Sequence, residues 1–286
     1  MEDREEQRWN LNGKTAVITG AASGFGRELA LCCQAAGMRL VLADLDLAAL
    51  EQTRALTGLP AAQALVQRCD VSNPDDVDRL ALTAQEHFGG THLLFNNAGV
   101  LAVGPIWKAT PRDWAWLFGV NVFGVANGIR SFVPAMLARG EPAWVVNSAS
   151  VAGLVCPPDM AAYSASKHAV VALSECLHHE LAQTGQPVGV SVLCPGFVDT
   201  GIADSARHRP AEWAEAPPEP SPLMDRARAA MRSGRLTAAD VARVTLDAVQ
   251  QRRFYVLPHH QAAVAVEHRL RDLLAGGAPY NPQARA

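Results

Sequence analysis

Short apolar runs rich in β-branched residues alternate with helix-length segments along almost the whole chain. These runs are 15–19, 40–43, 65–67, 93–95, 144–147, 188–193 and 254–257. Their hydrophobicity is continuous rather than alternating, which is typical of strands that are covered on both faces. Regular alternation of strand and helix predicts parallel pairing through right-handed crossovers. The sequence therefore predicts an α/β fold in one domain over 1–286, with a doubly wound parallel sheet and helices on both faces.

Composition and charge exclude several classes of protein. The 286 residues are 49% hydrophobic and 19% charged, with a net charge of -3, so we expect a globular protein that binds neither nucleic acid nor an anionic membrane. No apolar run approaches the roughly 18 residues of a membrane helix. The six cysteines form no Cys-x-x-Cys pair, and residues 1–10 do not resemble a signal peptide, which predicts reduced thiols and a cytoplasmic location.

The first predicted strand runs into a glycine-rich turn, Thr19-Gly20-Ala21-Ala22-Ser23-Gly24-Phe25-Gly26, and a helical pattern follows over 27–36. Such a turn lets backbone N–H groups approach a pyrophosphate, and the helix N-terminus adds its positive dipole end. A glycine turn alone is weak evidence, and the Gly-x-x-x-Gly-x-Gly spacing differs from the commonest dinucleotide fingerprint. In its strand, turn and helix context, it predicts a dinucleotide site in a Rossmann-type sheet.

Asp44 ends the second predicted strand, 18 residues after the glycine turn. A carboxylate at this position accepts hydrogen bonds from the adenosine ribose and repels a 2′-phosphate. Ser23 and Leu45 offer no cation to a phosphate, so the sequence predicts NAD rather than NADP. Two alternatives stay open. Asp44 could cap the next helix, or the long Arg27 and Arg39 side chains could reach a 2′-phosphate.

Tyr163 and Lys167 lie four residues apart at the start of a helical pattern, so their side chains share one helix face. A free phenol has a pKa near 10 and is a poor base at neutral pH, but a neighbouring cation favours the phenolate. The chain has only three tyrosines and, reading along it, only three lysines, which makes a chance pairing at this spacing improbable. The pair therefore predicts a tyrosine acid/base activated by lysine. The alternative is that the two residues are an exposed pair on a helix without a catalytic role.

Ser150 lies thirteen residues before Tyr163, just past the predicted strand 144–147. The carboxyl ends of parallel strands meet at one rim, so we expect one site to gather Gly20, Asp44, Asn97, Ser150 and Pro195. A serine hydroxyl there can donate to a substrate oxygen. Ser148 is the competing serine, and the spacing favours Ser150.

The glycine turn, Ser150 and the Tyr163–Lys167 pair make the chain resemble the short-chain dehydrogenase/reductase family. Further segments that carry the resemblance are Asp70-Val71, Asn96-Asn97-Ala98-Gly99, Asn121 and Pro195-Gly196-Phe197-Val198-Asp199-Thr200. The resemblance covers about 11–200, with 254–257 as the last strand. It implies that Tyr163 is the acid/base and that Lys167 binds the nicotinamide ribose and lowers the tyrosine pKa. It also implies that Ser150 orients the substrate and that Asn121 supports a water-linked proton path.

The resemblance further places Asp70 at the adenine, Asn97 at the cofactor ribose region and Thr200 at the carboxamide. The implied cofactor-binding residues are Gly20, Ser23, Gly24, Phe25, Gly26, Asp44, Asp70, Val71, Asn97, Ala98, Gly99, Tyr163, Lys167, Pro195, Gly196, Val198 and Thr200. The chain departs from the usual family pattern in Phe25, where isoleucine is common, and in 147–150, where paired serines are common. Neither departure removes a functional group.

Mostly apolar residues flank the predicted catalytic pair: 100–107, Leu154, Val155, Cys156, Pro157, Pro158, Met160, Phe197, Ile202 and Trp213. If they line a pocket rather than fill the core, they predict a bulky hydrophobic or aromatic alcohol or ketone. The segment 205–213 resembles that of lignin-derived aryl ether alcohol dehydrogenases, whereas steroid, terpenoid and polyketide alcohols stay open. The proline-rich stretch 214–222 predicts a loop, within a substrate lid over about 201–235.

Two further patterns concern the histidines and the C-terminus. The pairs His178-His179 and His259-His260 lack a His-Glu-x-x-His spacing, which predicts solvated surface histidines and no metal site. The helical tail over about 259–286 has an amphipathic pattern at 261–274, which either closes the pocket or joins subunits.

The sequence thus predicts an NAD-dependent oxidoreductase that moves a hydride between a bulky hydrophobic or aromatic secondary alcohol, or its ketone, and the nicotinamide. We expect a small-molecule substrate and a homodimer or homotetramer. One alternative is an NADPH-dependent ketone reductase of the same fold. Another is a non-catalytic dinucleotide-sensing protein, which would be expected to have lost the tyrosine–lysine pair that this chain keeps.

Overall fold

A computed structural model describes residues 9–210, 213 and 222–283. One sheet of seven parallel strands has the order β3-β2-β1-β4-β5-β6-β7. Its strands are β1 (Thr15–Thr19), β2 (Arg39–Asp44), β3 (Ala64–Arg68), β4 (Leu93–Asn96), β5 (Ala143–Ser148), β6 (Val188–Leu193) and β7 (Tyr255–Val256). From β1 the strand order runs outward to β2 and β3 on one side and to β4–β7 on the other, and doubly wound folds bind their ligands at this switch point between β1 and β4. The predicted fold class is therefore confirmed.

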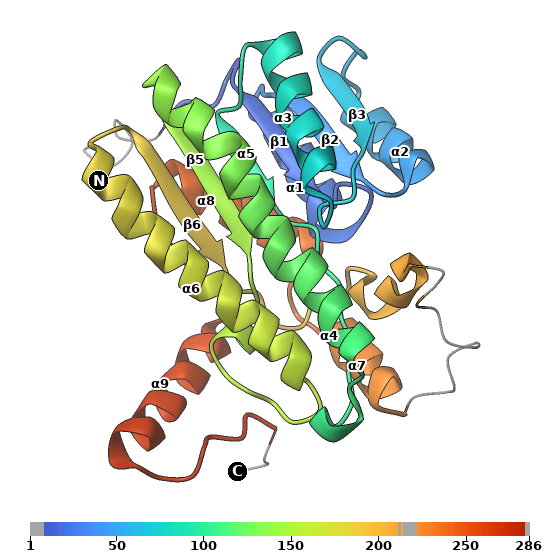
Figure 1. The fold of residues 1–286 in the computed structure, drawn as a ribbon, viewed down its shortest axis with the longest axis vertical. Helices are drawn as coiled ribbons and strands as arrows, with labels where there is room; N and C mark the ends of the chain where they lie inside the picture. Colours follow the sequence, from blue (N-terminus) through green and yellow to red (C-terminus); the bar gives the residue numbers. More distant parts are fainter. Residues whose placement is uncertain (1–8, 211–212, 214–221, 284–286) are drawn as a thin grey trace.

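Helices cover both faces of the sheet (Figure 1). One face packs on α3 (Pro74–Phe88), α5 (Gly124–Arg139) and α6 (Ala161–Thr184), and the other on α1 (Gly24–Ala35), α2 (Leu47–Thr57) and α8 (Ala238–Gln250). In β1, Ile18 enters the core beneath α1 and α8, whereas its neighbour Val17 enters the core beneath α3 and α5. Both side chains are fully buried, which explains the continuous hydrophobicity of the strands.

A helical turn with π geometry, η3 (Gly119–Phe123), joins α4 (Pro111–Phe118) to α5. Three short 3₁₀ helices, η2 (Ile106–Lys108), η4 (Val151–Gly153) and η5 (Ile202–His208), lie in the loops that follow β4, β5 and β6. Helices α7 (Pro222–Arg232) and α9 (His260–Ala275) lie beyond the carboxyl ends of the strands (Figure 1). Within the described ranges, no helix is both long and apolar enough to cross a bilayer.

The structure corrects the predicted loop 214–222 at its last residue. Pro222 is the first residue of α7, a position where the absent N–H costs nothing because it would have no helical partner. Residues 214–221 lie outside the described part of the chain.

Candidate active site

A cavity of about 970 Å³ opens at the carboxyl ends of the strands. Its walls include all five residues that were expected to meet there, Gly20, Asp44, Asn97, Ser150 and Pro195. They also include Tyr163, Lys167 and the other predicted cofactor residues Ser23, Gly24, Phe25, Asp70, Val71, Ala98, Gly99, Gly196, Val198 and Thr200. Of the predicted site residues, Gly26 and Asn121 are buried and do not line the cavity.

The glycine turn approaches its neighbours too closely for side chains. Gly20 and Gly24 have positive φ angles of 67° and 50°. A Cβ at Gly24 would lie 2.8 Å from the Thr200 carbonyl oxygen, and one at Gly26 would overlap the Gly20 carbonyl oxygen. The resulting open cradle at the start of α1 fits a pyrophosphate, since the first helical N–H groups have no intrahelical partners.

Asp44 is held at the end of β2 by two backbone donors. Ala22 N donates to Oδ2 at 3.1 Å and Asp46 N donates to Oδ1 at 3.3 Å. The N-cap of α2 is Asp46, whose side chain accepts a hydrogen bond from Ala49 N, so the capping alternative for Asp44 is wrong. The carboxylate lines the cavity, and each of its oxygens has a second lone pair for a ribose hydroxyl.

The two arginines considered near Asp44 have other partners. Arg27 donates to Ala22 O at 2.6 Å and to Thr53 Oγ1 at 3.1 Å. Arg39 lies over the Phe88 ring, 5.0 Å from its centroid. Neither lines the cavity.

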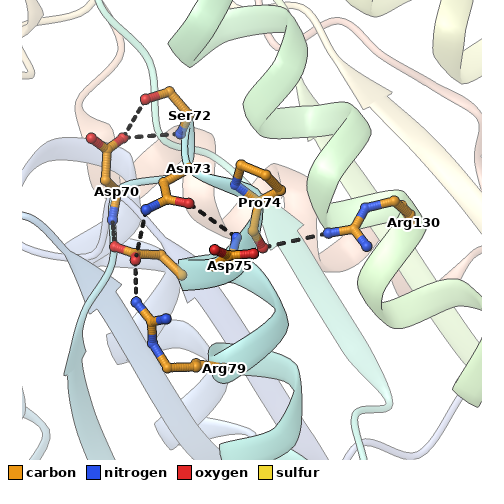
Figure 2. Close-up of polar contacts among 8 residues, drawn as sticks. Asp70, Ser72, Asn73, Pro74, Asp75, Arg79 and Arg130 are labelled. Carbon is orange, nitrogen blue, oxygen red and sulfur yellow. Dashed lines mark hydrogen bonds and ion pairs between the residues drawn. The ribbon is translucent and has the colours of Figure 1, made fainter.

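The loop after β3 positions Asp70 through a polar network (Figure 2). Asp70 N donates to Asp76 Oδ2 at 2.9 Å, and Asp76 is held in turn by Asn73 Nδ2 and by Arg79. Asp70 Oδ1 accepts from both the N and the Oγ of Ser72, at 2.9 and 2.6 Å. The Asp70 side chain is thus fixed at the cavity wall.

Asn97 links the two central strands. Its N donates to Thr19 Oγ1 at 2.9 Å and its Nδ2 donates to Thr19 O at 3.0 Å. Ser148 Oγ donates to Asn97 Oδ1 at 3.3 Å. The Ser148 hydroxyl therefore contacts Asn97, whereas the Ser150 hydroxyl is the one that hydrogen-bonds Tyr163.

Tyr163 and Lys167 lie in the first two turns of α6 and are both buried, with exposed fractions of 7% and 3%. Lys167 Nζ is 5.7 Å from the centroid of the tyrosine ring and donates to Ser148 O at 2.8 Å. Ser150 begins η4, where its Oγ accepts from Ala152 N at 3.1 Å. Its hydroxyl also hydrogen-bonds the Tyr163 side chain. A phenol, a hydroxyl and an ammonium are therefore brought together, as the sequence predicts.

The pKa of the tyrosine differs from the expectation. Burial raises the pKa of Tyr163 to about 12, partly offset by the Ser150 hydrogen bond, which lowers it. Burial also lowers the pKa of Lys167 to about 8. Desolvation disfavours the charged form of each group and is the largest cause of both shifts. The net lowering of the phenol pKa expected from Lys167 is therefore not found in this cavity.

Asn121 occupies the π turn between α4 and α5 and is fully buried. Its Oδ1 accepts from Val100 N at 2.8 Å, and its Nδ2 donates to Val100 O and Ser166 Oγ, both at 3.0 Å. The side chain thus braces the loop after β4 against α6. Its part in a proton path stays a prediction.

Comparisons with known proteins agree with this geometry. The family model for short chain dehydrogenases matches residues 14–211. The chain belongs to this family.

Three relatives are similar over most of the chain. A short-chain dehydrogenase/reductase from Burkholderia phymatum, solved in complex with NAD, has 48% identity and a TM-score of 0.92, covering 97% of this chain and 100% of that one. The 1-deoxy-11-beta-hydroxypentalenate dehydrogenase of Streptomyces exfoliatus is 37% identical over 92% of this chain and 88% of its own. The CLA biosynthesis dehydrogenase/reductase of Lactiplantibacillus plantarum is 32% identical over 94% and 96%. The chain is an NAD(P)-dependent oxidoreductase.

The substrate side of this short-chain dehydrogenase matches the predicted pocket only in part. Val100, Leu101, Val155, Pro157, Met160, Phe197 and Ile202 line the cavity. Residues 102–107, Leu154, Cys156, Pro158 and Trp213 do not. The chain turns outward after Leu101, so that Trp107 is 82% exposed. Counting residues on either side of the catalytic pair could not reveal that turn.

The dehydrogenase cavity has further walls that the sequence did not predict. Trp116 of α4, Met231 and Leu236 around the end of α7, and residues 258–262, 264–265, 280 and 282–283 all line it. Their signal in the sequence is an amphipathic pattern, which identifies an apolar face without identifying what that face covers.

One histidine pair also differs from the expectation. His178 and His179 are exposed, as predicted, but His259 is half-buried beside the dehydrogenase cavity. Its Nδ1 accepts a hydrogen bond from Gly196 N at 3.1 Å, and burial lowers its pKa. The described residues contain no group of three side chains that could hold a metal ion.

Proposed function

We propose that this enzyme oxidises a bulky hydrophobic or aromatic secondary alcohol, or reduces the corresponding ketone, with NAD as the cofactor. The observation that carries the proposal is the pair of buried side chains Tyr163 and Lys167, with the half-buried Ser150 hydrogen-bonded to Tyr163, beside largely apolar cavity walls. A small polar substrate such as a sugar would need several convergent polar groups on those walls.

In the direction of oxidation, Ser150 donates a hydrogen bond to the substrate oxygen and holds it beside Tyr163. The Tyr163 phenolate takes the hydroxyl proton, and the C–H bond at the same carbon breaks with its electron pair, which leaves a carbonyl. NAD, when bound, supplies the carbon that accepts this hydride. Lys167, fixed by its hydrogen bond to Ser148 O, places positive charge near the phenolate. Reduction runs the same steps backwards, with the phenol as proton donor.

Apolar contacts support a substrate with a large hydrocarbon body. Val155, Met160, Trp116, Ile202, Met231 and Leu236 face the cavity from five different segments. The Streptomyces relative is named for a hydroxypentalenate, which fits this size class. We expect a screen of aromatic, terpenoid and steroid secondary alcohols with NAD, read by absorbance of reduced nicotinamide, to find turnover. Turnover of small polyols alone would overturn the assignment.

The preference for NAD over NADP rests on Asp44. Its carboxylate is fixed by two backbone N–H groups at the cavity wall, where it would repel a 2′-phosphate. The B. phymatum relative was solved with NAD. Comparing kcat/KM with both cofactors tests the proposal, and a strong preference for NADPH would favour the ketone-reductase alternative.

The remaining alternative is a dinucleotide-sensing protein without catalysis. Such a protein would bind NADH and oxidise none of these alcohols, so turnover in the alcohol screen would exclude it. The predicted homodimer or homotetramer is tested by light scattering, where a mass of 30.5 kDa would contradict it. The cytoplasmic location stays a prediction that cell fractionation can test.

A further inference from the structure

We propose that Arg207 binds the pyrophosphate of the dinucleotide. It would contact this group from η5, in addition to the glycine turn. The proposal needs only dinucleotide binding and does not depend on which alcohol is the substrate. Arg207 lies in η5, outside the glycine turn and the catalytic helix, and its side chain lines the same cavity.

The short helix η5 is braced in position by polar contacts at two points. Leu101 N donates to Ser205 Oγ at 2.9 Å, and this hydroxyl donates to Leu101 O at 3.2 Å. Just past the helix, Arg209 forms an ion pair of 2.6 Å with Asp113 and stacks 4.6 Å from the centre of the Trp116 ring. The backbone that carries Arg207 is thus placed before any ligand arrives, which reduces the ordering cost of binding.

A short series of contacts connects Arg207 to the glycine turn. Its Nη1 donates to Gly201 O at 3.4 Å. Gly201 follows Thr200, whose backbone would be only 2.8 Å from a Cβ at Gly24. Gly24 begins α1, where unpaired N–H groups and the helix dipole favour an anion. The guanidinium is therefore tethered beside the place where a pyrophosphate fits.

The charge of Arg207 is free to meet an anion. Its side chain is exposed, and no carboxylate pairs with it among the described residues. The acid on the same short helix, Asp204, pairs instead with Arg228 at 2.9 Å. The single 3.4 Å hydrogen bond leaves most of its five N–H donors available, in a planar arrangement that suits two phosphate oxygens.

Electrostatics at the end of η5 distinguish the pyrophosphate from a 2′-phosphate. Burial and Arg207 lower the pKa of His208, whereas the Asp44 and Asp46 carboxylates raise it, and the net shift is downward. The adenosine end beside Asp44 thus faces an imidazole that is neutral near pH 7. A 2′-phosphate there would meet the Asp44 carboxylate, whereas the pyrophosphate lies between the glycine turn and Arg207.

The test measures binding rather than turnover. NADH fluorescence titrations, with ADP, AMP and adenosine as competitors, are run on the wild type, Arg207→Gln and Arg207→Lys. Arg226→Gln is the matched control, because Arg226 is exposed on α7, does not line the cavity and carries the same charge. Loss of one charge-assisted contact is expected to weaken NADH and ADP about tenfold.

We expect Arg207→Gln to leave adenosine within about twofold, Arg207→Lys to retain part of the ADP affinity and Arg226→Gln to match the wild type. The ADP affinity of Arg207→Gln should also depend less on salt concentration. Unchanged ADP binding would overturn the proposal. So would an equal loss for adenosine and ADP, because it indicates a damaged site, and so would a greater loss for NADPH than for NADH, because it indicates the 2′-phosphate.

Discussion

At the scale of single residues, burial shifts the pKa values of the two groups of the proposed catalytic pair in opposite directions. Desolvation raises the pKa of Tyr163 to about 12 and lowers that of Lys167 to about 8. The phenol is therefore protonated near neutral pH, and only a small fraction of the molecules carries the phenolate that can act as a base. The Ser150 hydroxyl, held on η4, opposes the rise because it hydrogen-bonds the phenol oxygen.

Replacing Tyr163 with Phe removes the hydroxyl that we propose as the acid/base and leaves the ring. We expect kcat to fall by roughly a thousandfold, within the range of general acid–base catalysis, while calorimetry finds NADH binding close to that of the wild type. Ser148→Ala is a suitable control, because the Ser148 hydroxyl contacts Asn97 rather than the phenol. Substantial activity in Tyr163→Phe would refute the assigned role.

The direction of the Tyr163 shift also predicts a pH dependence. Because the phenol pKa lies well above neutrality, the phenolate fraction grows with pH, so kcat/KM for alcohol oxidation should rise from about pH 7 to about pH 9. Ketone reduction needs the protonated phenol and should not rise over the same interval. Initial rates in both directions across this range check the prediction, and an oxidation rate independent of pH would contradict it.

At the scale of elements, catalysis and substrate contact come from different parts of the fold. Tyr163 and Lys167, the proposed catalytic pair, lie on α6, which packs directly on the sheet, and Ser150 caps η4, which packs on α6. Residues of η5, α7 and α9 line other parts of the cavity. A hydrogen bond connects α9 to the residue that follows η4: Arg269 Nη1 donates to Leu154 O at 2.8 Å. Of the two roles that the sequence leaves open for the tail, closing the pocket is the one that we propose.

Arg269→Ala should loosen α9 over the substrate side. We expect KM for a bulky alcohol to rise about fivefold through the loss of this hydrogen bond, with kcat and the NADH affinity nearly unchanged. Arg271→Ala is the matched control on the same helix, since the partner of Arg271 among the described residues is the exposed Glu267. An equal change in both variants, or none in KM, would show that α9 does not shape the substrate site.

At the scale of the whole molecule, a buried histidine connects the amino-terminal ends of three neighbouring strands, β1, β4 and β5. His92 precedes β4 and is 7% exposed. Its Nδ1 accepts from Thr15 N at 3.2 Å, and its Nε2 lies 3.1 Å from Glu141 Oε2. Burial lowers its pKa to about 4, assisted by Arg139 and opposed by the Glu141 hydrogen bond.

Between about pH 4 and pH 6.5, His92 therefore binds a proton in the unfolded chain but not in the folded protein. Stability should be constant above the ordinary histidine pKa near 6.5 and should fall as pH drops from there towards about 4, by up to about 3 kcal/mol. Urea unfolding at several pH values measures this dependence. His92→Gln should make it shallower, whereas His87→Gln, at an exposed histidine, should not. The same slope in all three proteins would exclude His92 as its source.

The sequence predicts the sheet and the close approach of Tyr163 and Lys167 well, because both depend on local patterns. Strands buried on both faces are continuous apolar runs, and Tyr163 and Lys167 share a helix turn whatever surrounds them. The position of η5 over the cofactor cradle could not be predicted, since it depends on contacts such as Arg209 with Asp113, 96 residues apart in the chain. His259 was misjudged for the same reason, because only folding brings it to Gly196.

The lysine content of the chain gives it a built-in chemical label. Lys14 and Lys108 retain exposure to solvent, whereas Lys167 is buried in the cavity with a pKa of about 8. An amine must be uncharged to attack an electrophile, so a small acylating reagent that fits the cavity should modify Lys167 readily just above pH 8. Peptide mass mapping has only three lysines to distinguish, and protection of Lys167 by NADH would report occupancy of the site without any substrate.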